Sequence, residues 1–487
     1  RKKSFASEIE HFWKKIHEKL NVKNCKLFEG VSPSSCNLEK LFKNPKNGHR
    51  ASKLYILRNH QQLIDGKESN MIKGKLHYGW IVIFMGLLTT IAAHGFGRMS
   101  YTIILPAMKD GLKFNYTQLG LLGTGNFVGY LIMAIIGGFF AARFGARIVI
   151  TLALILMGVT MILTGLSESF GFALAMRFFT GLGNGAAFIP AMALGSTWFA
   201  AKKRGFASGI VAGGIGAGTL ISGLLVPPIL TAYGPMGWRF SWYILGGAVL
   251  LITGVVFLFV RSNPEDKGLQ QIGADEKKVD SPASSNSNKV SSFKWAKVYK
   301  MGSVWYLGLI YFFYGLSYII YMVFFAAYLI KEMGFSQSWA GGLWAMVGGL
   351  SVFCGVIWGG ISDRLGRNWG AALAYLVLGL SYIIYALIKV KFGFYLSAVM
   401  FGLTAWSIPT IMAAAVGDFV GPRLAPAGLG FITLFFGIGQ ALGPALGGYL
   451  ADVSNSFSIP FLVAGGIAMM GMISSILLKK PAAPTGS

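Results

Sequence analysis

Long apolar stretches separated by short polar connections make up the chain from about residue 71 onward. Each stretch is close to the ~20 apolar residues that a helix needs to cross a bilayer. Charged residues are 13% of the chain and hydrophobic residues 54%, whereas soluble domains average about 25% charged residues. Because a lipid-embedded segment must satisfy its own backbone hydrogen bonds, stretches of this length predict helices. The pattern excludes an ordinary soluble enzyme and a disordered chain, and predicts an all-α polytopic membrane protein.

Twelve such stretches can be distinguished. Between the sixth and the seventh lies a segment rich in Ser, Asn and Lys, which cannot bury a core and is typical of a flexible linker. The expected membrane helices lie near 79–105, 116–140, 147–166, 170–193, 205–231, 240–260, 303–330, 338–360, 370–388, 392–413, 427–449 and 457–478.

The connection after the second stretch recurs, in related form, after the eighth. Gly138-Phe-Phe-Ala-Ala-Arg-Phe-Gly-Ala-Arg147 and Gly359-Gly-Ile-Ser-Asp-Arg-Leu-Gly-Arg367 start 221 residues apart. This repeat predicts two tandem six-helix halves, an arrangement in which transporters bind substrate between the halves near the membrane midplane. The expected domains are an N-terminal half at 71–260, a linker at 261–302, a C-terminal half at 303–480 and a tail at 481–487.

The N-terminal extension, residues 1–70, differs from the rest of the chain. It holds 15 Lys and Arg against 7 Asp and Glu, and it contains no apolar run long enough to cross a bilayer. Residues 7–20 could form an amphipathic helix, which would suit a membrane-surface arm or a partner-binding tail. The alternative, which we favour, is an appended segment that is disordered or plays no part in the membrane domain.

Basic residues of the membrane portion fall mainly in alternate connections, as the positive-inside rule requires. This distribution places both termini and the linker in the cytoplasm. A nucleic-acid-binding protein would instead cluster Lys and Arg on one solvated face, so we expect no nucleic-acid partner. The richer set of connections contains Arg143, Arg147, Lys202, Lys203, Arg204, Arg364, Arg367, Arg423, Lys479 and Lys480, and the poorer set contains Lys109, Lys113, Arg239, Lys331, Lys389 and Lys391.

Several motifs resemble the major facilitator superfamily. Its Gly-x-x-x-Asp-Arg-x-Gly-Arg signature is matched from Gly359 to Arg367, whereas Ala142 replaces the aspartate in the first-half copy. The segment from Arg177 to Gly185 is similar to the fourth-helix motif of the superfamily. The resemblance covers residues 71–480. It implies the twelve-helix fold, a bacterial cytoplasmic membrane and a monomer.

Two branches of the superfamily are resembled more narrowly. The segment from Gly97 to Pro106 is similar to the YbfB-type branch. The sequences His77-Tyr-Gly-Trp80 and Asn263-Pro-Glu-Asp-Lys-Gly268 are similar to the oxalate/formate and monocarboxylate group. This second likeness implies a small monocarboxylate-like substrate.

Ionisable residues at membrane depth are expensive and therefore point to function. In the first stretch His94 and Arg98 share one helix face, with Tyr101 close to it, and the fourth stretch carries Arg177. No acidic residue lies in the apolar part of the first six stretches. The resemblance places the first and fourth helices along the central cavity. Two unpaired guanidinium groups there would make an anion site, because Arg matches a carboxylate bidentately.

Other roles for these residues stay open. Arg177 could serve packing or coupling, and Arg98 could reach the headgroups or belong to a structural network. His94 could be an ordinary core residue. If it carries the coupling proton, the charge of Arg98 would oppose its protonation, and an arriving carboxylate would remove that opposition.

The seventh stretch supplies the opposite wall. Tyr311, Tyr314, Tyr318 and Tyr321 fall within an arc of about 80° on a helical wheel. Four phenols on one face need hydrogen-bond partners or water, so the pattern favours a polar cavity wall over interhelical packing. We expect Tyr311, Tyr314 and Tyr318 to contact substrate together with Arg98, Tyr101 and Arg177.

A second group of charged residues lies at the cytoplasmic ends of the stretches. Their spacing and the family pattern predict a network that locks an inner gate, with unequal contributions from the two halves because the first half lacks the acids. The expected gate residues are Arg143, Arg147, Asp363, Arg364, Arg367, Asp418 and Arg423.

These observations predict a secondary transporter that moves a small organic anion by alternating access, with a proton as coupling ion. An exporter of amphipathic compounds and a non-transporting ligand sensor are the alternatives. No metal, nucleophile or Gly-x-x-x-x-Gly-Lys-[Ser/Thr] pattern is present in the membrane portion, so neither an enzyme nor a bound cofactor is expected.

Overall fold

The computed structural model describes residues 77–273, 298–421 and 424–478. The N-terminal extension, most of the linker and the tail lie outside these residues, and the domain boundaries drawn through them stay predictions. Within the described residues the secondary structure is helical, apart from one isolated bridge between Phe199 and Ile272. The described residues belong to one compact unit.

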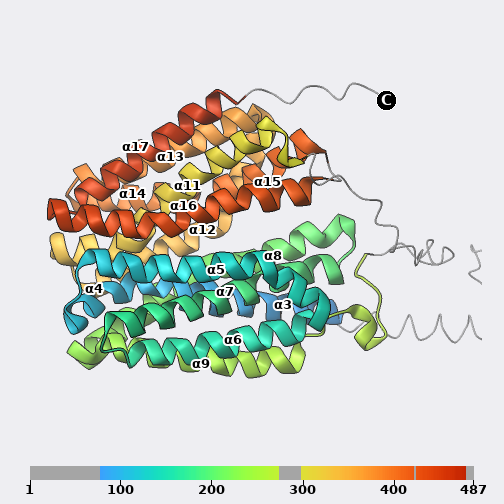
Figure 1. Ribbon diagram of the computed structural model, residues 1–487, viewed down its shortest axis with the longest axis horizontal. Coiled ribbons are helices and arrows are strands. Elements are labelled where there is room, and N and C mark those ends of the chain that lie inside the picture. Colours follow the sequence, from blue (N-terminus) through green and yellow to red (C-terminus); the bar gives the residue numbers. More distant parts are fainter. Residues whose placement is uncertain (1–76, 274–297, 422–423, 479–487) are drawn as a thin grey trace, which may run out of the picture. The chain divides into compact units, whose positions relative to one another are not determined.

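The described helices of the first half form six consecutive segments, drawn from blue to green in Figure 1. The first segment changes helix type twice along its length, and the others are regular α-helices. The elements are α3 (Tyr78–Thr90), the π-helix η4 (Ile91–Met99), α4 (Ser100–Leu112), α5 (Tyr116–Phe144), α6 (Ala146–Gly165), α7 (Phe170–Trp198), α8 (Ala201–Tyr233) and α9 (Gly237–Phe259).

The second half repeats this organisation, drawn from yellow to red in Figure 1. Its fourth segment is broken near Trp406, between α14 and α15. The elements are α11 (Gly302–Ala327), the π-helix η8 (Tyr328–Glu332), α12 (Gln337–Leu365), α13 (Arg367–Leu387), α14 (Lys391–Thr404), α15 (Ser407–Val420), α16 (Ala425–Ser454) and α17 (Ser458–Ile476).

The helical segments agree with the expected membrane crossings. Eleven of them, within the described residues, are long and apolar enough to cross a membrane. The longest, Lys203–Phe259, comprises α8 and α9 joined by the 3-10 helix η5 (Gly234–Met236). The arrangement is therefore consistent with twelve crossings, and the predicted all-α polytopic fold is confirmed.

The sequence repeat has a structural counterpart at the α5–α6 and α12–α13 connections. Gly145 and Gly366 occupy matching positions and adopt φ angles of 82° and 91°, which L side chains rarely tolerate. Each glycine ends one helix and begins the next within a single residue. We call this end of the bundle the signature end, and the end with the α4–α5 and α11–α12 connections the opposite end.

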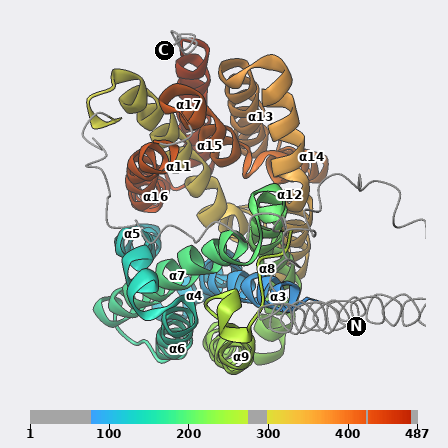
Figure 2. The same ribbon diagram turned by 90° about the vertical axis from the view of Figure 1, so that its right-hand side faces the viewer.

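The two halves meet mainly along two helix pairs, α5 with α16 and α8 with α12, and α4 also contacts α11; Figure 2 shows the two main pairs from the end of the bundle. Glycine allows the backbones to approach closely at both pairs. A Cβ atom on Gly120 of α5 would lie 2.1 Å from the carbonyl oxygen of Pro444, and one on Gly216 of α8 would lie 2.7 Å from that of Gly348. Small residues therefore set the distance between the halves.

We predict that Gly216→Ala destabilises the protein by about 1–3 kcal/mol, since the added methyl group meets backbone on α12. The measurement is the melting temperature of the purified protein in detergent. Gly213→Ala is the matched control on the same helix, because a Cβ atom there has no neighbour within 4 Å. Equal melting temperatures for the two variants would contradict the proposed close contact.

Candidate functional site

The first membrane segment changes from α-helix to π-helix over Ile91–Met99, and this stretch carries His94 and Arg98. π-Helical turns are uncommon and occur frequently at functional sites. The local sequence allows the close packing that accompanies the turn, because Gly95 lies against Gly218 of α8. Both ionisable side chains are buried, with exposed fractions of 3% for His94 and 8% for Arg98.

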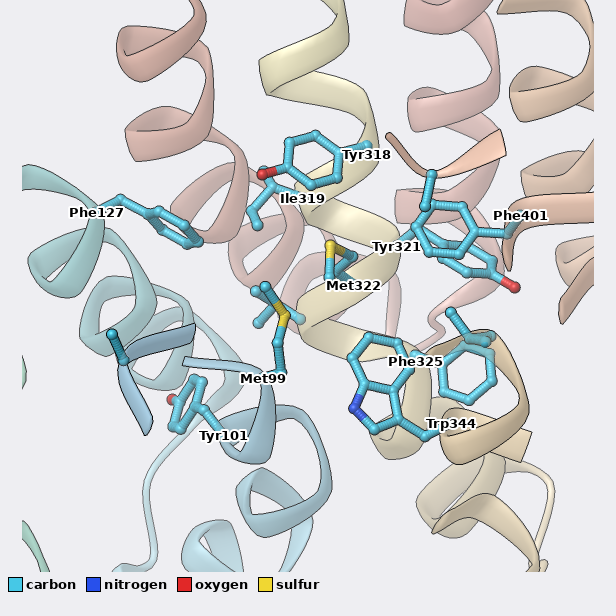
Figure 3. Packing of buried hydrophobic residues seen from close by; sticks show 14 of the residues in the cluster. Met99, Tyr101, Phe127, Tyr318, Ile319, Tyr321, Met322, Phe325, Trp344 and Phe401 are labelled. Carbon is cyan, nitrogen blue, oxygen red and sulfur yellow. The ribbon is translucent and has the colours of Figure 1, made fainter. Parts of the chain in front are cut away.

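Arg98 connects the two halves. Its guanidinium lies over the rings of Phe127 and Tyr130 of α5, at 4.1 and 5.2 Å from the ring centroids. Its Nη2 donates to the hydroxyl of Tyr318 of α11, at 3.3 Å. In Figure 3 the hydroxyl of Tyr318 points toward the side on which Phe127 lies. The Nε of Arg98 has no protein partner among the described residues.

Tyr318 is the centre of a short polar chain across the interface. Besides the bond from Arg98, its oxygen accepts a hydrogen bond from Nε2 of Gln440 on α16. With the Gln440 amide in this orientation, the proton of Tyr318 has no acceptor among the described residues. Gln440 is 1% exposed, and its Oε1 has no protein partner in this part of the chain. The chain Arg98–Tyr318–Gln440 thus keeps unused hydrogen-bonding capacity.

Sequence reasoning did not single out Gln440. The available signal was a lone amide in the otherwise apolar and glycine-rich stretch near 427–449. An amide carries no charge, so a search for ionisable residues passes over it.

Arg177 lies deeper in the first half and is 1% exposed. Its Nη1 donates to the carbonyl of Gly97 at 2.9 Å, and its guanidinium faces the rings of Tyr101 and Trp242. Tyr101 donates its hydroxyl to the carbonyl of Leu119, at 2.7 Å. The two residues form a packed cation–π pair, whereas the nearby Arg98 turns toward the second half.

A small cavity separates these two arginines. Its walls include Asn126 and Thr102 of the first half and Met322 of the second half. About 10 Å³ is available to the centre of a water molecule, which is room for about one water. In this conformation the space between the arginines is closed around a volume smaller than an organic anion.

His94 lies on the same side of the first segment as Arg98. Both side chains adjoin the ring of Tyr130, with ring centroids of His94 and Tyr130 5.8 Å apart. The ring of His94 also lies 4.3 Å from that of Phe188, and its Nδ1 has no protein partner in the described part.

The tyrosines of α11 divide into two groups. Tyr314 stacks on Tyr318 with ring centroids 4.5 Å apart, and Tyr311 stacks on Phe436 of α16 at the same distance. Tyr314 donates to the carbonyl of Ala405, which is available because the helix breaks between α14 and α15. Tyr321 instead contacts Ser397 inside the second half, at 2.7 Å. The stripe is therefore a stacked aromatic wall, and one phenol, Tyr318, reaches the first half.

Neither Arg98 nor Arg177 forms an ion pair among the described residues. The four ion pairs found there lie at the helix ends and join Lys331 to Asp110, Arg367 to Asp363, Arg367 to Asp418, and Lys389 to Glu332. A buried guanidinium without a carboxylate is strongly unfavourable unless other groups compensate it. Aromatic faces and neutral oxygens compensate these two in part, so the site favours an anion.

Among the described residues of the signature end, the charged network lies within the second half. Arg367 bonds Asp363 at 2.5 Å and Asp418 at 2.9 Å, joining α12, α13 and α15. Arg364 and Arg143 are exposed. Arg147 donates to the carbonyl of Phe257 within the first half. Arg423 lies outside the described residues.

At the opposite end charged groups join the halves directly. Asp452 of α16 accepts hydrogen bonds from the backbone amides of Tyr116 and Thr117, at 3.0 and 2.7 Å. It also accepts the hydroxyl of Thr117, at 2.6 Å. These amides belong to the first turn of α5, where a carboxylate also interacts favourably with the helix dipole. The ion pair between Lys331 and Asp110 adds a second cross-half contact.

The chain is similar to known proteins over most of its length. The model of the Major Facilitator Superfamily matches residues 87–425 and 353–487. A probable sulfoacetate transporter, SauU, of Cupriavidus necator is 26% identical over 78% of this chain and 90% of its own length. A hexuronate transporter of Bacillus subtilis is 23% identical over 82% of this chain and 94% of its own length.

A solved structure shows the same fold. It is that of a bacterial homologue of the human lysosomal transporter Spinster, in an inward-facing and unoccupied conformation. The TM-score is 0.66 at 18% sequence identity, covering 83% of this chain and 94% of the other.

We predict that Asp452→Asn opens the opposite end, because hydrogen bonds to a charged group contribute about 1.5–3 kcal/mol. A pair of spin labels at Glu168 and Val390, in connections of the first and second half at this end, would report a longer distance by pulsed electron resonance. Asp110→Asn is the control, since an exposed ion pair contributes about 0–1 kcal/mol. An unchanged distance in Asp452→Asn would rule out the closing role.

Proposed function

This chain belongs to the Major Facilitator Superfamily, and we propose that it is a secondary transporter that carries a small organic anion across the membrane by alternating access. The observation that carries the proposal is Arg98, a buried guanidinium with no carboxylate partner in the described residues, located where the two halves meet. Membrane transport by a non-enzymatic protein follows from the family. The substrate class and the roles of individual residues are proposals.

Arg98 and Tyr318 would bind the anion from opposite sides. The unused Nε of Arg98 and the free proton of Tyr318 are both donors, and a carboxylate or sulfonate offers acceptor oxygens to each. Such an anion would replace the direct bond between Arg98 and Tyr318 by two charge-assisted bonds. Since the donors come from different halves, the bound anion would link the halves.

The similarity to named transporters supports an anionic substrate. The names of the two relatives above specify sulfoacetate and hexuronate, and both compounds carry an acidic group that is ionised at neutral pH. A guanidinium binds either acidic group through the same fork of N–H donors. The shared element is therefore a small organic acid.

Alternating access requires that the two ends open in turn. The opposite end is joined mainly by Asp452, which accepts hydrogen bonds from the first turn of α5, and the exposed pair Lys331–Asp110 adds a weaker contact. At the signature end the described network around Arg367 lies within the second half, so this network does not tie the second half to the first. We propose that the signature end faces the cytoplasm of a bacterial cell, with both termini on that side, and that Asp363 and Asp418 act in its gate.

Proton coupling is proposed through His94. Its ring lies beside Tyr130, which also contacts Arg98, so the charges of histidine and arginine share one environment. When the site is empty, the positive charge of Arg98 disfavours protonation of His94. A bound anion offsets the charge of Arg98, so protonation of His94 becomes more favourable. A proton and the anion would then load together.

We predict that Arg98→Gln abolishes anion binding and that Arg98→Lys weakens it more than tenfold, because lysine keeps the charge but loses the planar fork. The measurement is the thermal shift of the purified protein with a series of carboxylates and sulfonates. Arg239→Gln is the control, since Arg239 donates to the carbonyl of Gly165 away from the site. Native affinity in a folded Arg98→Gln protein would show that the anion site is elsewhere.

We predict that His94→Gln keeps anion exchange between the two sides but loses uptake driven by an inward proton gradient. The measurement is uptake of labelled substrate into proteoliposomes with and without that gradient. His77→Gln is the matched control, because His77 lies outside the site, where its Nδ1 accepts a hydrogen bond from the first turn of α3. Burial lowers the pKa of His77, so the neutral form of this histidine is favoured. Gradient-driven uptake that survives in His94→Gln would remove this histidine from the coupling step.

A further inference from the structure

The two copies of the repeated connection each leave one arginine exposed, Arg143 in the first half and Arg364 in the second. In the second half Arg367 is bound by two carboxylates, those of Asp363 and Asp418. The first-half copy has Ala142 in place of the acid. Arg143 is exposed and has no ion pair among the described residues, and its guanidinium lies 5.6 Å from the ring of the adjacent Phe144. One cation therefore remains available at the signature end of α5.

An apolar groove begins at the same place. It runs between α5 and α6, which diverge and leave α7 as its floor; Figure 1 shows α7 between these two helices. The groove has a volume of about 430 Å³. Its lining includes Phe140 and Phe144 from α5, Ile148 and Leu152 from α6, and Leu182 and Ala186 from α7. Every lining side chain is apolar, so the groove suits a hydrocarbon chain.

The groove and the cation lie side by side. Phe144 forms part of the groove wall and is also the ring nearest to the guanidinium of Arg143. Arg147, the next arginine, is engaged elsewhere, because it donates to Phe257 of α9 and lies over that ring. The site therefore combines the apolar groove with one positive charge, that of Arg143, at its end.

We propose that this groove binds one acyl chain of an anionic phospholipid, whose phosphate lies against Arg143. Arginine is well suited to phosphate, and basic residues beside apolar grooves of membrane helices are recognised sites for anionic headgroups. The occupant is a membrane lipid because a free phosphate compound would gain nothing from the apolar slot. The site is separate from Arg98 and independent of the transported anion.

The test compares retention of phosphatidylglycerol and phosphatidylcholine with identical acyl chains by the purified full chain, using native mass spectrometry. We expect the protein to retain phosphatidylglycerol more strongly than phosphatidylcholine. In Arg143→Gln the ratio of retained phosphatidylglycerol to phosphatidylcholine should fall about fivefold, with phosphatidylcholine binding unchanged. Arg143→Lys should keep most of the preference. Arg364→Gln is the matched control, because Arg364 is the exposed arginine at the equivalent position of the second half.

A second variant tests the apolar slot. Leu182→Trp places a larger side chain on the floor of the groove and should weaken retention of both lipids while leaving Arg143 in place. The proposal is overturned if Arg143→Gln keeps the preference, if Arg364→Gln loses it equally, or if Leu182→Trp retains lipid like the unaltered protein. Competition by soluble glycerol 3-phosphate at equal affinity would also overturn it, since that result would identify a free phosphate site.

Discussion

The guanidinium of Arg98 is buried where the two halves meet, and no carboxylate among the described residues pairs with it. The rest of the site depends on this one constraint. Burying a charge is tolerated only when nearby groups replace its hydration. Arg98 receives two aromatic faces from α5 and one phenol from α11, all of them neutral. These contacts compensate the charge only in part. Because the phenol belongs to the other half, an anion that completes the compensation also changes how strongly the halves are joined.

Besides the hydrogen bonds that cross between the halves near the site, such as those from Arg98 to Tyr318 and from Thr102 to Met322, two kinds of contact join the halves. Along α5–α16 and α8–α12 they are close backbone approaches at glycine, such as Gly216 against Gly348, which involve no charge and can be exchanged by small sliding movements. At the opposite end they are charged and directional, as in the carboxylate of Asp452 on the first turn of α5. A transition between states must break the second kind entirely, whereas the first kind can adjust. We therefore expect part of the energetic barrier to lie at the opposite end of the bundle.

The fold could be predicted from the sequence because hydropathy and the repeat each depend on local residue identity. His94 and Arg98 could be found because charge is conspicuous in an apolar stretch. What could not be predicted depends on side-chain direction: the wheel places Tyr321 with Tyr318, yet Tyr321 turns to Ser397 inside the second half. Likewise Arg367, rather than Arg364, joins Asp363 to Asp418. Gln440 carries no charge, and only the three-dimensional arrangement brings its amide to Tyr318.

Together the two arginines favour anions over other solutes. Arg177 is held within the first half by the carbonyl of Gly97 and by two rings, whereas Arg98 reaches Tyr318 of the second half, and the Nε of each arginine has no protein partner among the described residues. Both line one small cavity and repel each other across a medium that screens poorly. An anion entering beside them relieves this repulsion in addition to forming its own bonds. A neutral solute would leave the repulsion in place and a cation would increase it. Selectivity for anions would thus follow because no carboxylate among the described residues neutralises the two arginines.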